Sequence, residues 1–292
     1  MIGVVAALAA ALAWTVASGM WRSLPTSLNS LQLNGLKNAI ATLVFVPVLI
    51  ALPWLEQWHS IGLLLISGFI GIAIGDTFYL SALRRLGTRR TLTIEAISPL
   101  LAGIGSAVLM GEPQSSQAWI GAFLVSISVV MVARQAPPRK GNIANNTAMS
   151  QRLGIIFSLA AVICGLSGAF LSRLVLKQGE LMPLDTSAVR LLGGLLLLTP
   201  LLMSFPISFT GPHPAQKRWH KVIMATLLGT NLGILLTQVV FRLLPVGQGV
   251  TMLSTAPVMA LALSRQEGDR PRMAGILSSL FSVIGVALAV TG

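Results

Sequence analysis

Ten apolar stretches, most of them about twenty residues long, follow one another along this chain of 292 residues. A helix that crosses the hydrocarbon core of a bilayer needs about 20 predominantly apolar residues. The stretches cover residues 2–21, 30–52, 61–83, 91–110, 117–133, 153–175, 185–206, 220–241, 247–264 and 273–291. Because most connections are short, the sequence predicts an all-α membrane protein with ten transmembrane helices and no soluble domain.

The composition agrees with a membrane protein. Hydrophobic residues make up 54% of the chain and charged residues only 10%, against about 25% charged in a typical soluble domain. We therefore assign the net charge of +12 to loops on an anionic membrane face. No basic tract interleaved with aromatic residues predicts nucleic-acid binding. The single cysteine, Cys164, leaves no disulfide framework and no thiolate metal site.

The two halves of the chain repeat each other. The longest connection, residues 134–152, separates two sets of five stretches. An offset of 158 aligns Gly71 with Gly229, Gly75 with Gly233, Arg84 with Arg242, Thr93 with Thr251 and Pro99 with Pro257. Because five is odd, the second copy enters the membrane from the opposite side, which predicts an inverted repeat typical of secondary transporters. The predicted organisation is a repeat over 1–134, a linker over 135–151 and a repeat over 152–292.

Several marks in this pattern are typical of one family. They are a basic residue early in helices two and seven (Lys37, Arg190), a proline in helices four and nine (Pro99, Pro257), and Gly111-Glu112 before "WIGAFLVSISVVMVA" at 119–133. With them the chain resembles EamA-type carriers of the drug/metabolite transporter superfamily over nearly its whole length. The second copy departs from the first, since Glu267 there precedes Gly268. The resemblance implies a secondary transporter of small organic metabolites in the inner membrane, with proton-coupled export left open.

The basic residues predict the orientation. The connections after helices 1, 3, 5, 7 and 9 hold Arg22, Arg84, Arg85, Arg89, Arg90, Arg134, Arg139, Lys140, Arg152, Lys217, Arg218, Lys221, Arg265, Arg270 and Arg272. The opposite connections hold only Arg173, Lys177 and Arg242. Cytoplasmic loops carry the excess of Lys and Arg. We therefore expect both termini in the periplasm, although members of the resembled family more often keep them inside.

Four charged residues fall well inside apolar stretches: Lys37, Asp76, Glu95 and Arg190. Each costs about 2.5–3.5 kcal/mol at a helix centre and is expected to face protein or water. One interpretation is internal ion pairing of Lys37 with Asp76 or Glu95. The other is a site for substrate and protons, and the two interpretations are compatible.

Arg190 differs from Lys37 because its own repeat offers no matching acid, apart from Asp185 near the start of the same helix. The positions that correspond to Asp76 and Glu95 are Ile234 and Leu253. An unpaired buried guanidinium is costly, and a bound anion relieves that cost. We therefore expect Arg190 to contact an anionic group of the substrate and Lys37 to pair internally.

Three uncharged polar residues join this candidate substrate and ion site. Tyr79 lies three residues after Asp76, and Asn231 and Gln238 share one face of helix eight. The alternative for Tyr79 is an interfacial anchor, and for the two amides it is hydrogen bonding between helices. Pro99 and Pro257 predict helix kinks, which free carbonyls beside a cavity or simply bend the helices.

Two other functional classes remain as alternatives. "GLSG" at 165–168 matches the pattern around the serine of a rhomboid protease, but such an enzyme needs a histidine on a later helix, and all three histidines lie in loops or at helix ends. A channel is the other alternative. No metal-binding or phosphate-loop motif appears, so we expect no metal and no cofactor. The expected partners are a small-molecule substrate and the lipid bilayer, in a monomer or a homodimer.

Overall fold

The computed structural model describes residues 1–22, 28–135, 148–204, 215–259 and 273–292. Within these ranges the regular elements are all helices. In chain order they are α1 (Ile2–Arg22), α2 (Ser30–Val44), α3 (Val46–Ala51), α4 (Trp58–Gly68), η1 (Phe69–Gly75), α5 (Asp76–Glu95), α6 (Ser98–Met110), α7 (Ser116–Gln135), α8 (Ala148–Gln178), α9 (Pro183–Met203), α10 (Ala215–Thr226), η2 (Leu227–Leu232), α11 (Gly233–Leu243), α12 (Val246–Leu253) and α14 (Met273–Thr291).

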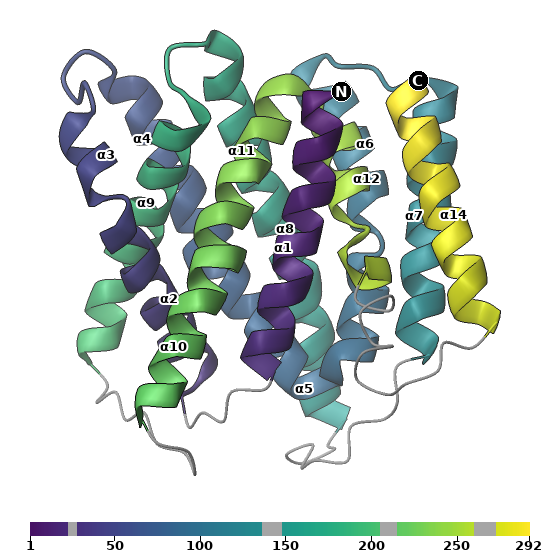
Figure 1. Cartoon of the computed structure of the whole chain (residues 1–292), viewed down its shortest axis with the longest axis horizontal. Coiled ribbons are helices and arrows are strands. Elements are labelled where there is room, and N and C mark those ends of the chain that lie inside the picture. The colour runs from purple at the N-terminus through teal and green to yellow at the C-terminus, as the bar shows by residue number, and fades with distance from the viewer. Residues whose placement is uncertain (23–27, 136–147, 205–214, 260–272) are drawn as a thin grey trace.

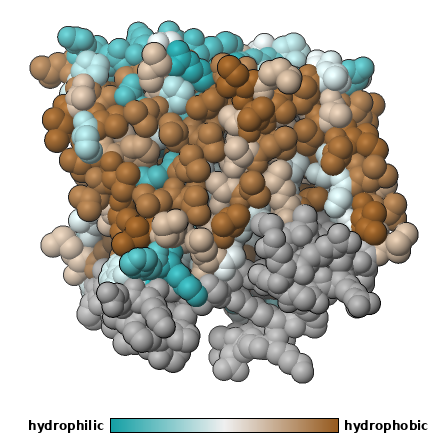
Figure 2. Space-filling view, in the orientation of Figure 1, coloured by the Kyte–Doolittle hydropathy of each residue, from teal (hydrophilic) through white to brown (hydrophobic). Residues whose placement is uncertain are grey.

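The helices stand side by side in one bundle, and both termini lie at the same end of it (Figure 1). We call this end the termini end. In the described ranges six helical stretches are long and apolar enough to cross a membrane, and Ser116–Met131 and Gly275–Thr291 are shorter apolar helices. Apolar residues cover the middle of the face in Figure 2, and hydrophilic residues gather at its termini end. The all-helical prediction is confirmed, while the count of ten spans and the inverted repeat stay predictions.

The core joins the first and last parts of the chain. Its largest cluster includes Ala7 and Ala10 of α1, Phe170 of α8, Phe241 of α11 and Met252 of α12, all buried. Small alanine side chains let the backbone of α1 approach its neighbours closely, which is how helices pack in membranes. The two halves are therefore interleaved rather than separate bodies.

Two predicted boundaries differ from the structure. Residues 84–90, predicted as a connection, lie within α5, because this arginine-rich segment contains no proline and consists largely of good helix formers. The predicted helix over 30–52 is divided between α2 and α3 at Phe45, just before Pro47. Arg84 and Arg85 also have structural partners: Arg84 donates to the carbonyl of Leu28, and Arg85 lies 4.8 Å from the ring centroid of Phe157.

The same irregularities occur twice, 158 residues apart. The π-helices η1 and η2 begin at Phe69 and Leu227. The chain then leaves regular helix at residues 96–97 and again at 254–255, and helical structure resumes just before Pro99 and Pro257. The helix breaks therefore lie where the two prolines predict kinks. The wide turns of η1 and η2 have no counterpart among the sequence predictions.

Candidate substrate site

The π-helix η1 leads directly to Asp76, which lies within a membrane span. Asp76 follows η1 directly and begins α5, within the apolar span Trp58–Leu86. Asn34 of α2 is fully buried and donates from Nδ2 to the carbonyls of Ile72 (2.9 Å) and Ala73 (3.2 Å). Polar groups of the irregular turn thus have a side-chain partner at membrane depth, where an unpaired carbonyl would be costly.

Asp76 forms an ion pair with Lys37, one turn along α2 from Asn34. The Lys37 side chain is 18% exposed and the Asp76 side chain 38%. This pair is one of the two internal pairings that the sequence allows for Lys37. The Asp76 carboxylate thus keeps accessible surface within an apolar span.

The predicted residues Tyr79 and Glu95 lie on α5 with Asp76, and Arg190 lies on α9 against Gly71 of η1. Tyr79 and Glu95 are half-buried. In the described ranges Glu95 has no cation within ion-pair distance, so Lys37 is committed to Asp76 and not to Glu95.

Arg190 of α9 is buried and has no acidic partner within ion-pair distance among the described residues. Its Nε is buried without a hydrogen-bond partner. Its Nη2 lies between two glycines, since a Cβ added to Gly71 of η1 or to Gly168 of α8 would be 3.2 Å from that nitrogen. The absence of side chains at both positions makes room for the guanidinium beside η1.

The two predicted amides of helix eight, Asn231 and Gln238, lie on η2 and α11, not on the elements that carry Asp76 and Arg190. Asn231 in η2 donates from Nδ2 to the carbonyl of Ala41 on α2 at 2.9 Å, a hydrogen bond between the two halves. Gln238 of α11 is fully buried, and neither its Nε2 nor its Oε1 has a partner among the described residues. Their geometry favours the packing alternative for Asn231 and leaves Gln238 without an assigned partner.

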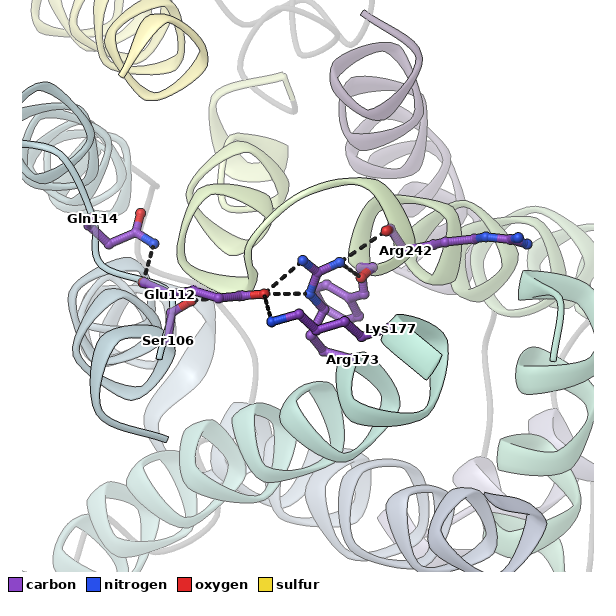
Figure 3. A network of polar contacts seen from close by, with 7 residues as sticks. Ser106, Glu112, Gln114, Arg173, Lys177 and Arg242 are labelled. Carbon is purple, nitrogen blue, oxygen red and sulfur yellow. Dashed lines mark hydrogen bonds and ion pairs between the residues drawn. The ribbon is translucent and has the colours of Figure 1, made fainter. Parts of the chain in front are cut away.

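A second polar network, absent from the predicted site, lies at the termini end (Figure 3). Arg173 of α8 donates to Glu112 Oε1 from Nε (3.1 Å) and Nη2 (2.7 Å), and Lys177 Nζ lies 3.2 Å from the same oxygen. Arg173 Nη1 donates to the carbonyls of Phe241 (2.7 Å) and Arg242 (3.0 Å). The sequence marked Glu112 only as part of a family pattern, and no local signal pairs it with a residue 61 positions away.

The residues around Glu112 determine its protonation state. Burial alone would raise the pKa of this carboxyl, but hydrogen bonds and positive charge from Arg173 and Lys177 outweigh that effect and hold the pKa below its usual value. Glu112 lies between α6 and α7, outside the apolar span Thr91–Met110. It is therefore ionised near neutral pH.

The serine of the protease-like pattern shows no catalytic arrangement. Ser167 Oγ donates to the carbonyl of Ile163 one turn earlier in α8, at 2.8 Å. Of the histidines, His59 packs its ring against Trp58, His220 lies on α10, and His213 is outside the described residues.

Comparison with known proteins identifies the family of this chain. No curated protein sequence matches it. A solved crystal structure with 19% sequence identity superposes with a TM-score of 0.79 over 99% of this chain and 96% of its own, which shows a shared fold. The model of the EamA-like transporter family matches residues 1–134 and 152–291, nearly the whole length. The chain is thus a multi-pass membrane protein and a transporter of small molecules, and it belongs to the EamA-like transporter family.

Proposed function

We propose that this protein is a secondary carrier of small organic solutes in the inner membrane. It works by alternating access between two inverted five-helix repeats, residues 1–134 and 152–292, joined by a linker over 135–151. Two observations support the repeats: the family model matches each half separately, and the wide turns and helix breaks recur 158 residues apart. Two related halves around one central site are the arrangement that alternating access requires.

The unpaired guanidinium of Arg190 carries the proposal. A buried arginine without an acidic partner is costly in a membrane, and a bound anion compensates that cost. Lys37 already neutralises Asp76. Of the two cations predicted well inside apolar stretches, Arg190 is therefore the one available to a ligand. We infer that Arg190 binds a carboxylate or another anionic group of the substrate, with Tyr79 beside it.

Glu95 and Asp76 are the proposed proton carriers. Glu95 has no cation within ion-pair distance among the described residues, and Asp76 exchanges Lys37 for a proton. We expect Asp76→Asn or Glu95→Gln to abolish uptake driven by a pH gradient while substrate exchange is partly kept. If both variants retain normal pH-driven uptake, the carboxylates have only structural roles.

The test uses proteoliposomes loaded with a mixture of small carboxylates, and mass spectrometry identifies which of them undergo counterflow. We expect Arg190→Gln to lower the apparent affinity for the transported carboxylate about tenfold, in keeping with the loss of a charge-assisted hydrogen bond. The matched control is Arg152→Gln, which removes an exposed arginine from α8. Unchanged affinity in well-folded Arg190→Gln contradicts the substrate role, and flux without counterflow favours a channel.

A further inference from the structure

The Glu112 network joins parts of the chain that belong to different halves. Glu112 lies in the connection between α6 and α7, in the first half. Arg173 and Lys177 lie near the end of α8, and the carbonyls of Phe241 and Arg242 end α11, all in the second half. A movement that separates the halves at the termini end must break these contacts.

Neighbouring residues hold the Glu112–Arg173 pair in one geometry. Gly111 has φ +62°, a left-handed conformation that ends α6, and the amide of Glu112 donates to the carbonyl of Ser106 at 3.0 Å. Ser106 Oγ lies 3.3 Å from Glu112 Oε2 and orients the carboxylate. Each nitrogen of the Arg173 guanidinium has an acceptor.

Both partners are largely removed from solvent, although they lie close to one end of the molecule. The side chains of Arg173 and Glu112 are each 10% exposed. Protein atoms therefore surround the pair at this end, whereas the side chain of Asp76, within the apolar span Trp58–Leu86, remains 38% exposed. The pair at the termini end is thus more buried than the acid of the candidate site.

We propose that the Glu112–Arg173 pair is the contact that holds the carrier closed at its termini end. The proposal rests on the proposed alternating access. Removing one partner of a buried ion pair leaves the other charge buried and unpaired, whereas opening lets water solvate both charges. Losing Glu112 therefore raises the free energy of the closed conformation relative to the open one, and the population shifts toward opening at this end.

The experiment measures access to the candidate site from each side. A cysteine replaces Tyr79 in a Cys164→Ser background, so that it is the only thiol in the chain. A charged, membrane-impermeant methanethiosulfonate reagent is applied to membrane vesicles of each orientation, and the two reaction rates are compared. Melting temperature and size-exclusion profile report whether each variant is folded.

With Glu112 intact, we expect slower reaction from the termini side than from the opposite side. Glu112→Gln should change the ratio of the two rates about tenfold in favour of the termini side, within the range of coupling typical of conformational switches. Arg173→Lys, which keeps the charge but loses the fork of donors, should give a smaller change in the same direction. Lys177→Gln should change it least, because Lys177 is 53% exposed. The control is Glu56→Gln, which removes an exposed acid between α3 and α4 at the same end and should leave the ratio unchanged.

Three outcomes overturn the proposal in distinguishable ways. A ratio that Glu112→Gln leaves unchanged shows that the pair does not set the closed end. Rates that rise together from both sides show a loosened fold and a merely structural pair. No reaction from either side in any variant, or equal rates with Glu112 intact, contradicts alternating access itself and with it the proposed function.

Discussion

The four charged residues within the membrane differ in their pairing, and this decides what each substitution does. Lys37 and Asp76 form a pair, whereas Arg190 and Glu95 have no ion-pair partner among the described residues. Removing a single charge is therefore most costly at Lys37 or Asp76, because it leaves the other residue unpaired. In the proposed function, a ligand compensates the charge of Arg190 and a proton that of Glu95.

Lys37→Gln should lower the yield of folded protein, because it leaves Asp76 without its cation. The loss should stay below the 3–5 kcal/mol or so typical of fully buried pairs, since the Asp76 side chain is 38% exposed. Adding Asp76→Asn should restore much of the yield, as fluorescence-detected size exclusion measures. Rescue by Glu95→Gln and not by Asp76→Asn would contradict the observed pairing.

The Glu112 carboxyl predicts the pH dependence of stability. Burial raises the pKa of this carboxyl, but Arg173 and Lys177 outweigh burial and lower the pKa in the folded protein. The stabilising contribution of Glu112 is therefore complete above the unfolded pKa of about 4.3. The contribution is lost as the pH falls through the lower, folded pKa. The difference in melting temperature between the unmodified protein and Glu112→Gln should be constant from pH 8 to pH 5 and should shrink only below about pH 4. A difference that shrinks between pH 7 and pH 6 would contradict this assignment.

At the scale of elements, α4 and η1 depend on close contact with α9. A Cβ added to Gly68 would lie 1.8 Å from the carbonyl oxygen of Arg190, and a backbone atom cannot move aside as a flexible side chain can. Gly68→Ala should therefore destabilise the protein by about 1–3 kcal/mol or more and displace Arg190. Thermal unfolding in detergent measures the effect.

Gly62→Ala is the matched control in the same helix. No atom lies within 4 Å of a Cβ added there, so the substitution should leave stability unchanged or raise it slightly through helix propensity. Equal destabilisation by both substitutions would show that general flexibility, and not the crossing of α4 and α9, requires these glycines.

Sequence patterns predicted the elements better than their irregularities. Apolar length predicted an all-helical chain, because that signal is local, and the breaks at 96–97 and 254–255 lie just before Pro99 and Pro257. Gly71 and Gly75 predicted only close packing, since a wide turn has no residue signature of its own. The ion pair of Lys37 followed from the few acids within the membrane, whereas Glu112–Arg173 depends on tertiary contact between distant segments.

For the whole molecule, the unequal distribution of basic residues predicts how it sits in the membrane. Both termini lie at one end of the bundle (Figure 1), and most basic residues belong to the connections predicted at the other end. A C-terminal fusion to alkaline phosphatase should therefore be active, and a C-terminal fusion to green fluorescent protein should be dark. The reverse pattern would place both termini in the cytoplasm.

The matching π-helices η1 and η2 have a consequence for ancestry. A π-turn adds one residue to a helix and is most simply produced by a single insertion. On the proposed duplication, one insertion made before the halves were joined explains its presence at corresponding places in both. The ancestral five-helix chain would then already have carried the wide turn and would have assembled as a pair of oppositely inserted copies. A related five-helix protein with an unbroken α-helix at this place would contradict that order of events.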